Sequence, residues 1–190
     1  AVCGTSARVE TAVAEKTEEE LLQAAEDACK AKDYAKMLEY YEQAAELGSA
    51  EAVRHIGVSY VSGEGVEQNY EKALEYYGKA LAIVVRVLGE DHPYTATTYN
   101  NMAGVFKSQG DYGKALKYYS MTLAIRERVL GTEHPDTATT YNEMAEMIRM
   151  QGDYEKALEY YKKAYVTRLS AFGENHPETK DSQLDLMIMA

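Results

Sequence analysis

The sequence has no tryptophan, two phenylalanines, three prolines and only two cysteines, Cys3 and Cys29. The cysteines have no spacing typical of a metal site or a disulfide framework, which favours a reducing compartment, and we expect a cytoplasmic protein. No apolar run approaches the roughly 18 residues that cross a membrane, so we expect no membrane partner. The first ten residues contain no basic region followed by an apolar core, and no signal peptide is expected.

Basic residues are also in short supply. The chain has 20 Lys and Arg residues against 31 Asp and Glu residues, which gives a formal net charge of −11. Nucleic-acid binding needs clustered Lys and Arg opposite the phosphates, so the composition argues against a nucleic-acid partner. An acidic chain is instead suited to solubility and to basic partners.

Tyrosine is abundant, with 17 residues, and the tyrosines fall at the positions of a repeat. Gly-Asp-Tyr at 110–112 returns at 152–154, and His-Pro at 92–93 returns at 134–135 and at 176–177. Each of these shifts is 42 residues. A fixed period of this length is typical of repeat proteins, in which each unit buries its apolar face against its neighbours.

Apolar spacing predicts that each unit is a pair of helices. A capping-box signature at Thr17 and Glu20 opens the first helix, and a turn at Lys32–Asp33 precedes a second helix that begins near Tyr34. The expected fold class is all-α, a right-handed superhelical solenoid of four antiparallel helix pairs and one extra helix. In the two later pairs the helices are expected over 95–108, from Tyr112, over 137–150 and from Tyr154.

Small residues recur where two helices of a pair must meet. Gly57, Ala103 and Ala145 stand at this position in the first helix of successive pairs, and an alanine stands opposite in the second helix. Only a small side chain allows such a close approach of two backbones. One tyrosine of each adjacent pair is expected in the core, with its neighbour on the convex or inter-repeat side; the pairs are Tyr40-Tyr41, Tyr76-Tyr77, Tyr118-Tyr119 and Tyr160-Tyr161.

Two stretches resemble known repeat families. From Ala50 to Ala73 the sequence reads A-x-A-x(3)-I-G-x(2)-Y-x(2)-G-x-G-V-x(2)-N-Y-x-K-A, which resembles the Sel1-like repeat. The runs LAIRERVLGTEHPDTA from Leu123 and YNEMA from Tyr141 are similar to the tetratricopeptide repeats of kinesin light chains, whose units are longer than usual. We therefore expect a flexible arm over 1–16, Sel1-like repeats over 17–69, kinesin-light-chain-like repeats over 70–178 and a terminal helix over 179–190, which is either a cap or a truncated repeat.

Sites for chemistry find little support. The His-Pro pairs at His92, His134 and His176 lie one repeat apart, too far for one metal ion, and are better explained as turns in which proline starts a helix that a nearby Thr or Asp caps. The glycine-rich stretch 62–69 lacks the phosphate-loop signature, and no nucleophile motif is present. We expect no enzyme activity, no catalytic residue, no metal and no cofactor.

The remaining candidate is a groove along the first helices of the pairs. The resemblance implies that their inward polar side chains contact a protein or peptide partner, and Asn101 stands where peptide-binding repeats use an asparagine to hold an extended backbone. Glu143 and Asp185 take the equivalent positions in later units, which disfavours a carboxylate-terminated ligand and favours Lys or Arg side chains. The predicted groove residues are Arg54, His55, Thr97, Asn100, Asn101, Lys107, Asn142, Glu143, Glu146 and Arg149. For Asn100 and Asn142 the alternative is a solvated helix surface or hydrogen bonding between helices.

The alternative is a structural role without a peptide ligand. Leu184, Leu186, Ile188 and Met189 place apolar side chains on more than one side of the last predicted helix. A terminal repeat normally has a polar outer face, so this pattern also favours a homo-oligomer formed through the C-terminal helix or the ends of the array.

Overall fold

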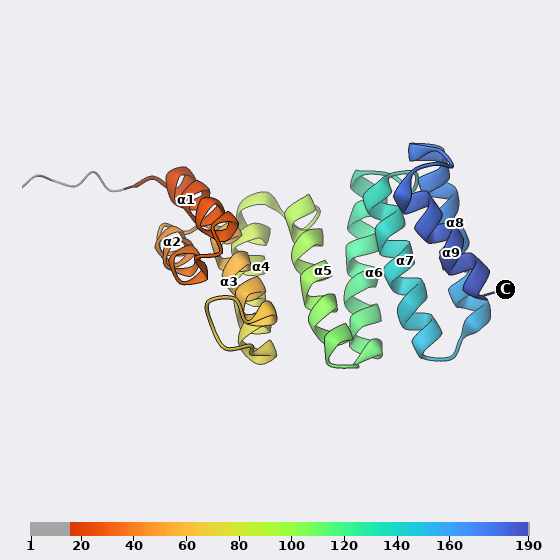
Figure 1. Ribbon diagram of the computed structural model, residues 1–190, viewed down its shortest axis with the longest axis horizontal. Helices are drawn as coiled ribbons and strands as arrows, with labels where there is room; N and C mark the ends of the chain where they lie inside the picture. Colours follow the sequence, from red (N-terminus) through yellow and green to blue (C-terminus); the bar gives the residue numbers. More distant parts are fainter. Residues whose placement is uncertain (1–15, 190) are drawn as a thin grey trace, which may run out of the picture.

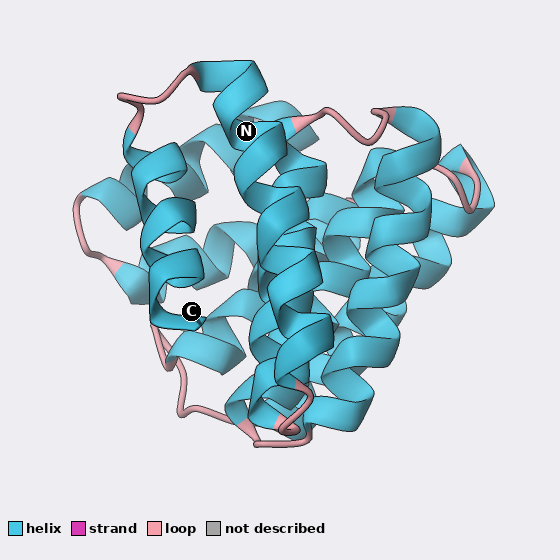
Figure 2. Cartoon of the chain, turned by 90° about the vertical axis from the view of Figure 1, so that its right-hand side faces the viewer, coloured by secondary structure: helices cyan, strands magenta, loops and turns pink. Residues whose placement is uncertain are grey.

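The structure is a computed structural model that describes residues 16–189, and in that range it contains nine α-helices and no β-strand. Figure 1 shows the helices following one another along the long axis of the molecule, with α1 and α9 at opposite ends, and Figure 2 shows only loops between them. The odd-numbered and even-numbered helices form the pairs that the repeat predicted, and we name them A helices and B helices. Their bounds are α1 Glu18–Lys30, α2 Tyr34–Glu46, α3 Ala50–Ser62, α4 Tyr70–Leu88, α5 Pro93–Ser108, α6 Tyr112–Val129, α7 Pro135–Met150, α8 Tyr154–Phe172 and α9 Pro177–Met189.

The Gly-Asp-Tyr motif is the start of a B helix. The carboxylate of Asp111 accepts a hydrogen bond of 3.0 Å from the backbone N–H of Lys114, and Gly110 before it has a φ of 76°. A left-handed residue followed by an Asp cap therefore makes the tight turn into α2, α6 and α8. The same bond is made by Asp33, Asn69 and Asp153, with the position before Asp33 occupied by Lys32 at a φ of 58°.

The His-Pro motif is the start of an A helix, and here the histidine itself is the cap. Nδ1 of His92 accepts a bond of 3.2 Å from the N–H of Tyr94, and Nδ1 of His134 accepts one of 3.1 Å from Asp136. Helices α5 and α7 consequently begin at Pro93 and Pro135, two residues before the predicted starts, and α9 begins at Pro177 instead of 179. The expectation of a Thr or Asp cap was wrong because an unprotonated ring nitrogen can serve as the acceptor.

The small positions do bring the two helices of a pair together. Ala103 and Ala145 are fully buried, as are Ala73 and Ala115 on the facing B helices. A Cβ placed on Gly57 would lie 2.7 Å from Cε1 of Tyr77, so a side chain there would collide with the tyrosine. The prediction that one tyrosine of each adjacent pair lies in the core is also confirmed. The buried members are Tyr41, Tyr77, Tyr119 and Tyr161, and their neighbours are half-buried between helices.

Threonines organise the residues that lengthen the unit. Thr95 and Thr137 donate to the carbonyl oxygens of Gly89 and Gly131, which end the preceding B helices, at 3.0 and 2.8 Å. Thr122 is fully buried and donates to the carbonyl of Ala96 on the facing helix at 3.2 Å. The extra residues of the longer unit therefore lengthen both of its helices. Among the A helices, α5 and α7 have 16 residues against 13 in α3, and among the B helices α4 has 19 against 13 in α2.

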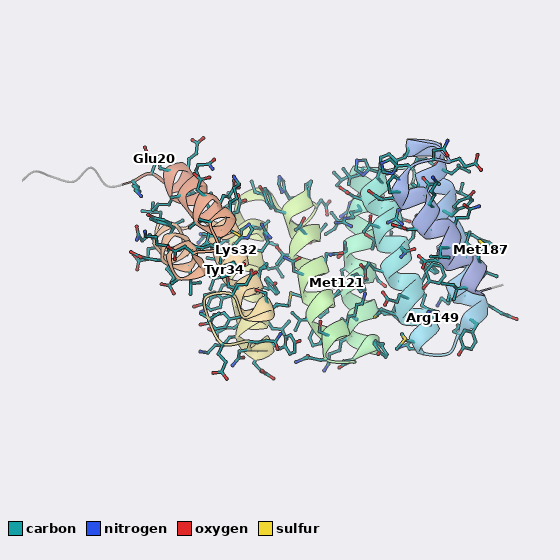
Figure 3. The ribbon with its side chains drawn as sticks, viewed as in Figure 1. Glu20, Lys32, Tyr34, Met121, Arg149 and Met187 are labelled. Carbon is teal, nitrogen blue, oxygen red and sulfur yellow. The ribbon has the colours of Figure 1, made fainter. Side chains whose placement is uncertain are left out.

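The two ends differ from the interior. The predicted arm lies outside the described residues except for Lys16, whose Nζ lies 4.5 Å from the centre of the Tyr40 ring. At the other end, Met187 of α9 takes the small position of Gly57 and Ala103, and its side chain is 69% exposed. Figure 3 shows Met187 on the outer side of the array, and none of the helices that the structure describes covers it.

Candidate functional site: a pocket on the A helices

A pocket of about 420 Å³ lies across α3, α5 and α7, over the buried tyrosines of α4 and α6. It brings together four of the predicted groove residues, which are Asn100, Asn101, Lys107 and Glu143. The other side chains that line it are Val58, Val61, Ser62, Tyr77, Gly104, Val105, Ser108 and Tyr119. The predicted groove residues did not include Tyr77 and Tyr119 of the B helices, which line the pocket. Each stands 24 residues before a groove position, Asn101 or Glu143, and this constant spacing could have indicated their place.

The side chains of two buried tyrosines, Tyr77 and Tyr119, lie at the pocket against the A helix of the next pair. Tyr119 donates to Oε2 of Glu143 at 3.1 Å, and Tyr77 lines the pocket together with Asn101, the residue in the same register as Glu143. Burial raises the pKa of Tyr77 to about 12, and burial together with the Glu143 charge raises the pKa of Tyr119. Both phenols are therefore neutral donors at the floor of the pocket.

Lys107 closes one end of the pocket. Its Nζ lies 3.1 Å from Oε2 of Glu143 and 2.5 Å from Oε2 of Glu146, and all three side chains are about one-third exposed. Burial alone would lower the pKa of Lys107, but the hydrogen bonds and charges of Glu146 and Glu143 outweigh it and the net shift is upward. The lysine was predicted as a groove residue; the structure shows that its charge is already paired within the chain.

Asn100 and Asn101 differ in their surroundings. The Oδ1 atom of Asn100 is buried and has no hydrogen-bond partner among the described residues, and the same holds for Oδ1 of Asn142 on α7. Asn101 is half-buried and its amide makes no hydrogen bond with the part of the chain that the structure describes. An amide that both donates and accepts is therefore left exposed to the pocket at position 101.

Arg54 and His55 lie outside this pocket. Nη2 of Arg54 is 2.7 Å from Nε2 of His55, and the His55 ring stacks on Tyr41 with the ring centres 4.8 Å apart. Burial, and then the nearby Arg54 charge, lower the pKa of His55 to about 4, so the imidazole is neutral at physiological pH. Arg54 lines a separate pocket with Glu51 and Tyr94, and His55 lines one with Cys29 and Tyr41.

The other predicted residues are distributed along the array. Thr97 donates to the carbonyl of Pro93 in its own helix at 3.1 Å and lines a small cleft beside α6. Arg149 of α7, marked in Figure 3, lies near the Tyr161 hydroxyl and lowers its pKa against the larger upward effect of burial. Burial raises the pKa of Asp185 on α9, and a hydrogen bond with Asn142 opposes that shift.

Neither a metal site nor a membrane span emerges from the described range. Within residues 16–189 no three His, Cys, Asp or Glu side chains are placed to hold one ion. None of the helices that the structure describes is both long enough and apolar enough to cross a bilayer.

Comparison with known proteins identifies the repeats. A family model described as tetratricopeptide repeat matches residues 66–128, 96–170 and 136–186, which together span 66–186, well over half of the chain. A model of the Sel1 repeat matches residues 29–49, just before the stretch that carries the Sel1-like motif. The search of curated proteins finds no match.

Several solved structures share the fold. BtubC (BKLC) from P. vanneervenii superposes with a TM-score of 0.76 at 22% identity, over 90% of this chain and 70% of that one. A kinesin light chain-like protein of Podosopora anserina with nearly identical TPR-like repeats gives 0.72 at 18% identity, over 92% of this chain and 87% of that one. MamA gives 0.62 at 20% identity, over 82% and 80%. At these identities the likeness shows the all-α repeat solenoid and nothing about partners.

Proposed function

This chain belongs to the tetratricopeptide repeat family, and from that premise we propose that it is a non-enzymatic, cytoplasmic interaction module that holds a segment of a protein partner in a concave groove along its A helices. Repeats of this family generally mediate protein–protein interaction or act as scaffolds. The observation that carries the proposal is the pocket across α3, α5 and α7, which gathers Asn100, Asn101, Lys107 and Glu143 on one face. A rigid helical scaffold that presents polar side chains in a hollow is suited to an extended segment.

The charges on this face favour a partner with Lys or Arg side chains. Glu143 and Glu146 offer four carboxylate oxygens against one Lys107 ammonium, so the cluster keeps a net negative charge. Asp185 continues the acidic series on α9. A partner that ends in a carboxylate at this point would meet like charge, whereas a basic side chain would complete the neutralisation.

The experiment uses a photo-crosslinking residue at Ser108, which lines the pocket and is exposed, with the exposed Lys117 on α6 as a matched site outside it. A partner captured only from position 108 is then tested for affinity against Asn101→Ala combined with Asn142→Ala. We expect the double variant to bind at least tenfold more weakly, because it removes the Asn101 amide from the pocket and the Asn142 amide that holds Asp185. Unchanged affinity would show that the groove is not the binding surface.

A self-associating module is the second candidate, and one observation favours it. Leu184, Met187 and Ile188 of α9 are 56%, 69% and 70% exposed, which places three large apolar side chains side by side on the last helix. Light scattering over a concentration series separates the two functions. A constant mass near 21.2 kDa leaves the groove for a partner, whereas a dimer that Met187→Asp with Ile188→Asp dissociates establishes association through α9.

A further inference from the structure

Gly104 leaves a gap in the inner face of α5. The glycine is helical, and a Cβ built on it would meet no atom within 4 Å. In the register of the repeat its counterpart is Glu146 of α7, whose carboxylate pairs with Lys107 of α5 in the preceding pair. The pocket is thus open at Gly104 because the side chain that would cross it is missing, while the equivalent place one repeat later is closed by an ion pair.

The walls around this gap are mainly apolar. Val58 and Val61 of α3 are half-buried at the rim, and Tyr77 and Val105 beneath them are 2% and 1% exposed. These four side chains belong to one hydrophobic cluster of α3, α4 and α5. An aliphatic side chain placed over Gly104 would extend that cluster and be removed from water, which is the main source of affinity in such a site.

We propose that the space over Gly104 is a binding site for a single aliphatic side chain of an extended partner segment that also carries a Lys or Arg. This inference rests on the proposed function and names the chemistry of its partner. The occupant follows from the two ends of the pocket. Asn101 lies beside the gap with its amide free of hydrogen bonds within the described range, and is suited to a passing peptide backbone. Glu143, at the far end, is suited to the basic side chain.

The test selects peptides from a random heptapeptide display library on the full chain. Gly104→Leu fills the gap, and Gly104→Glu installs the residue found at the equivalent position 146. The matched control is Gly78→Leu on α4. Gly78 is exposed, and like Gly104 it is helical and has no atom within 4 Å of an added Cβ. Circular dichroism of all three variants establishes that they remain folded.

The expected result is a selected peptide with one aliphatic residue and one Lys or Arg. It should bind Gly78→Leu like the unsubstituted chain, and should bind Gly104→Leu and Gly104→Glu at least tenfold more weakly. Replacing the aliphatic residue of the peptide by Ser should cause a loss of the same order.

Peptides that bind all the variants equally, or a selection with no aliphatic residue, would overturn the proposal, as would a library from which nothing binds. If such peptides, or the captured partner, still depend on Asn101 and Asn142, the groove function stands and only the site over Gly104 is wrong. If Gly104→Leu instead abolishes a dimer in light scattering, the occupant is a second copy of the chain.

Discussion

The contact between one pair of helices and the next is made of different chemistry in the two halves of the molecule. Between α6 and α7, Nη1 of Arg126 donates to the carbonyl of Asp136 at 2.8 Å and to Oγ1 of Thr140 at 2.7 Å. Between α8 and α9, the buried Arg168 repeats the arrangement and donates to Oγ of Ser182 at 2.6 Å. Between α4 and α5 the same position is Val84, which is 4% exposed.

The arginine contacts hold neighbouring pairs together, whereas the apolar contact at Val84 leaves room for a ligand beside it. An arginine with several directional bonds fixes the placement of the next pair, whereas an apolar contact fixes it only by packing. Glu143 of α7 also bonds to both helices of the preceding pair, through Lys107 of α5 and Tyr119 of α6. The open pocket over Gly104 borders the apolar contact. One repeat sequence can therefore provide both a rigid part and a receptive part through a few changes at the same positions.

Removing Arg126 should have the largest effect on stability of the substitutions that test this comparison. Arg126→Ala leaves the Thr140 hydroxyl and the Asp136 carbonyl without their charged donor and opens a gap beside α6, so we expect a loss of about 3 kcal/mol in the free energy of unfolding. Urea denaturation measures it. Arg128→Ala is the control, because Arg128 is more than half exposed and its pairing with Asp91 is on the surface, where the expected loss is below about 1 kcal/mol. Equal losses would remove the distinction.

Adding a methyl group to the small position of the second pair should come next. Gly57→Ala places a Cβ 2.7 Å from the Tyr77 ring, and we expect a loss of about 2 kcal/mol after the gain in helix propensity is included. Gly104→Ala on α5 is the matched substitution in open space and should instead stabilise by about 0.5–1 kcal/mol. Thermal unfolding should show a lower midpoint for Gly57→Ala and a higher midpoint for Gly104→Ala. A stabilised Gly57→Ala would contradict the close contact between Gly57 and Tyr77.

Acid should weaken the N-terminal pairs through His55. Its pKa is lowered from 6.5 to about 4 in the folded chain, so its contribution is present above pH 6.5 and is lost as the pH falls from 6.5 towards 4. Because the side chain is 31% exposed, we expect the loss to be roughly 2 kcal/mol, below the full value of the shift.

Comparing the pH dependence of unfolding in the unsubstituted chain and in His55→Gln isolates this group, since the carboxylates are common to both. The variant should lose less stability over that interval. Parallel curves would show that His55 is not responsible.

The smallest expected effect is a gain. Lys32 has a φ of 58° where the later pairs have Gly110 and Gly152. Lys32→Gly relieves the left-handed strain at the cost of a more flexible unfolded chain, and we expect a net stabilisation of about 0.5 kcal/mol. Thermal unfolding measures it, with Lys30→Gly at the end of α1 as a control that should destabilise.

The all-α repeat fold could be predicted from the sequence because its signals are local. The 42-residue period, the Asp111-type caps and the small positions each depend on neighbours a few residues away, and all three agree with the structure. The candidate site could be predicted only as a set of inward positions. The ion pair of Lys107 with Glu143 joins residues 36 apart, and the pocket exists because Gly104 is bare beside Val61; both depend on how pairs stack. The histidine caps were missed because their chemistry depends on a ring nitrogen instead of a hydroxyl or carboxylate.

Met187 bears on how far such an array can extend. Each interior pair is a unit of a one-dimensional lattice whose spacing is set by a glycine or alanine at the crossing of the two helices, as at Gly57, Ala103 and Ala145. A methionine at that crossing keeps a helix packed against this face of α9 further out than glycine or alanine does in the interior pairs. The spacing between helices therefore changes at Met187, and a helix that packs on this face of α9 does not continue the register of the interior pairs.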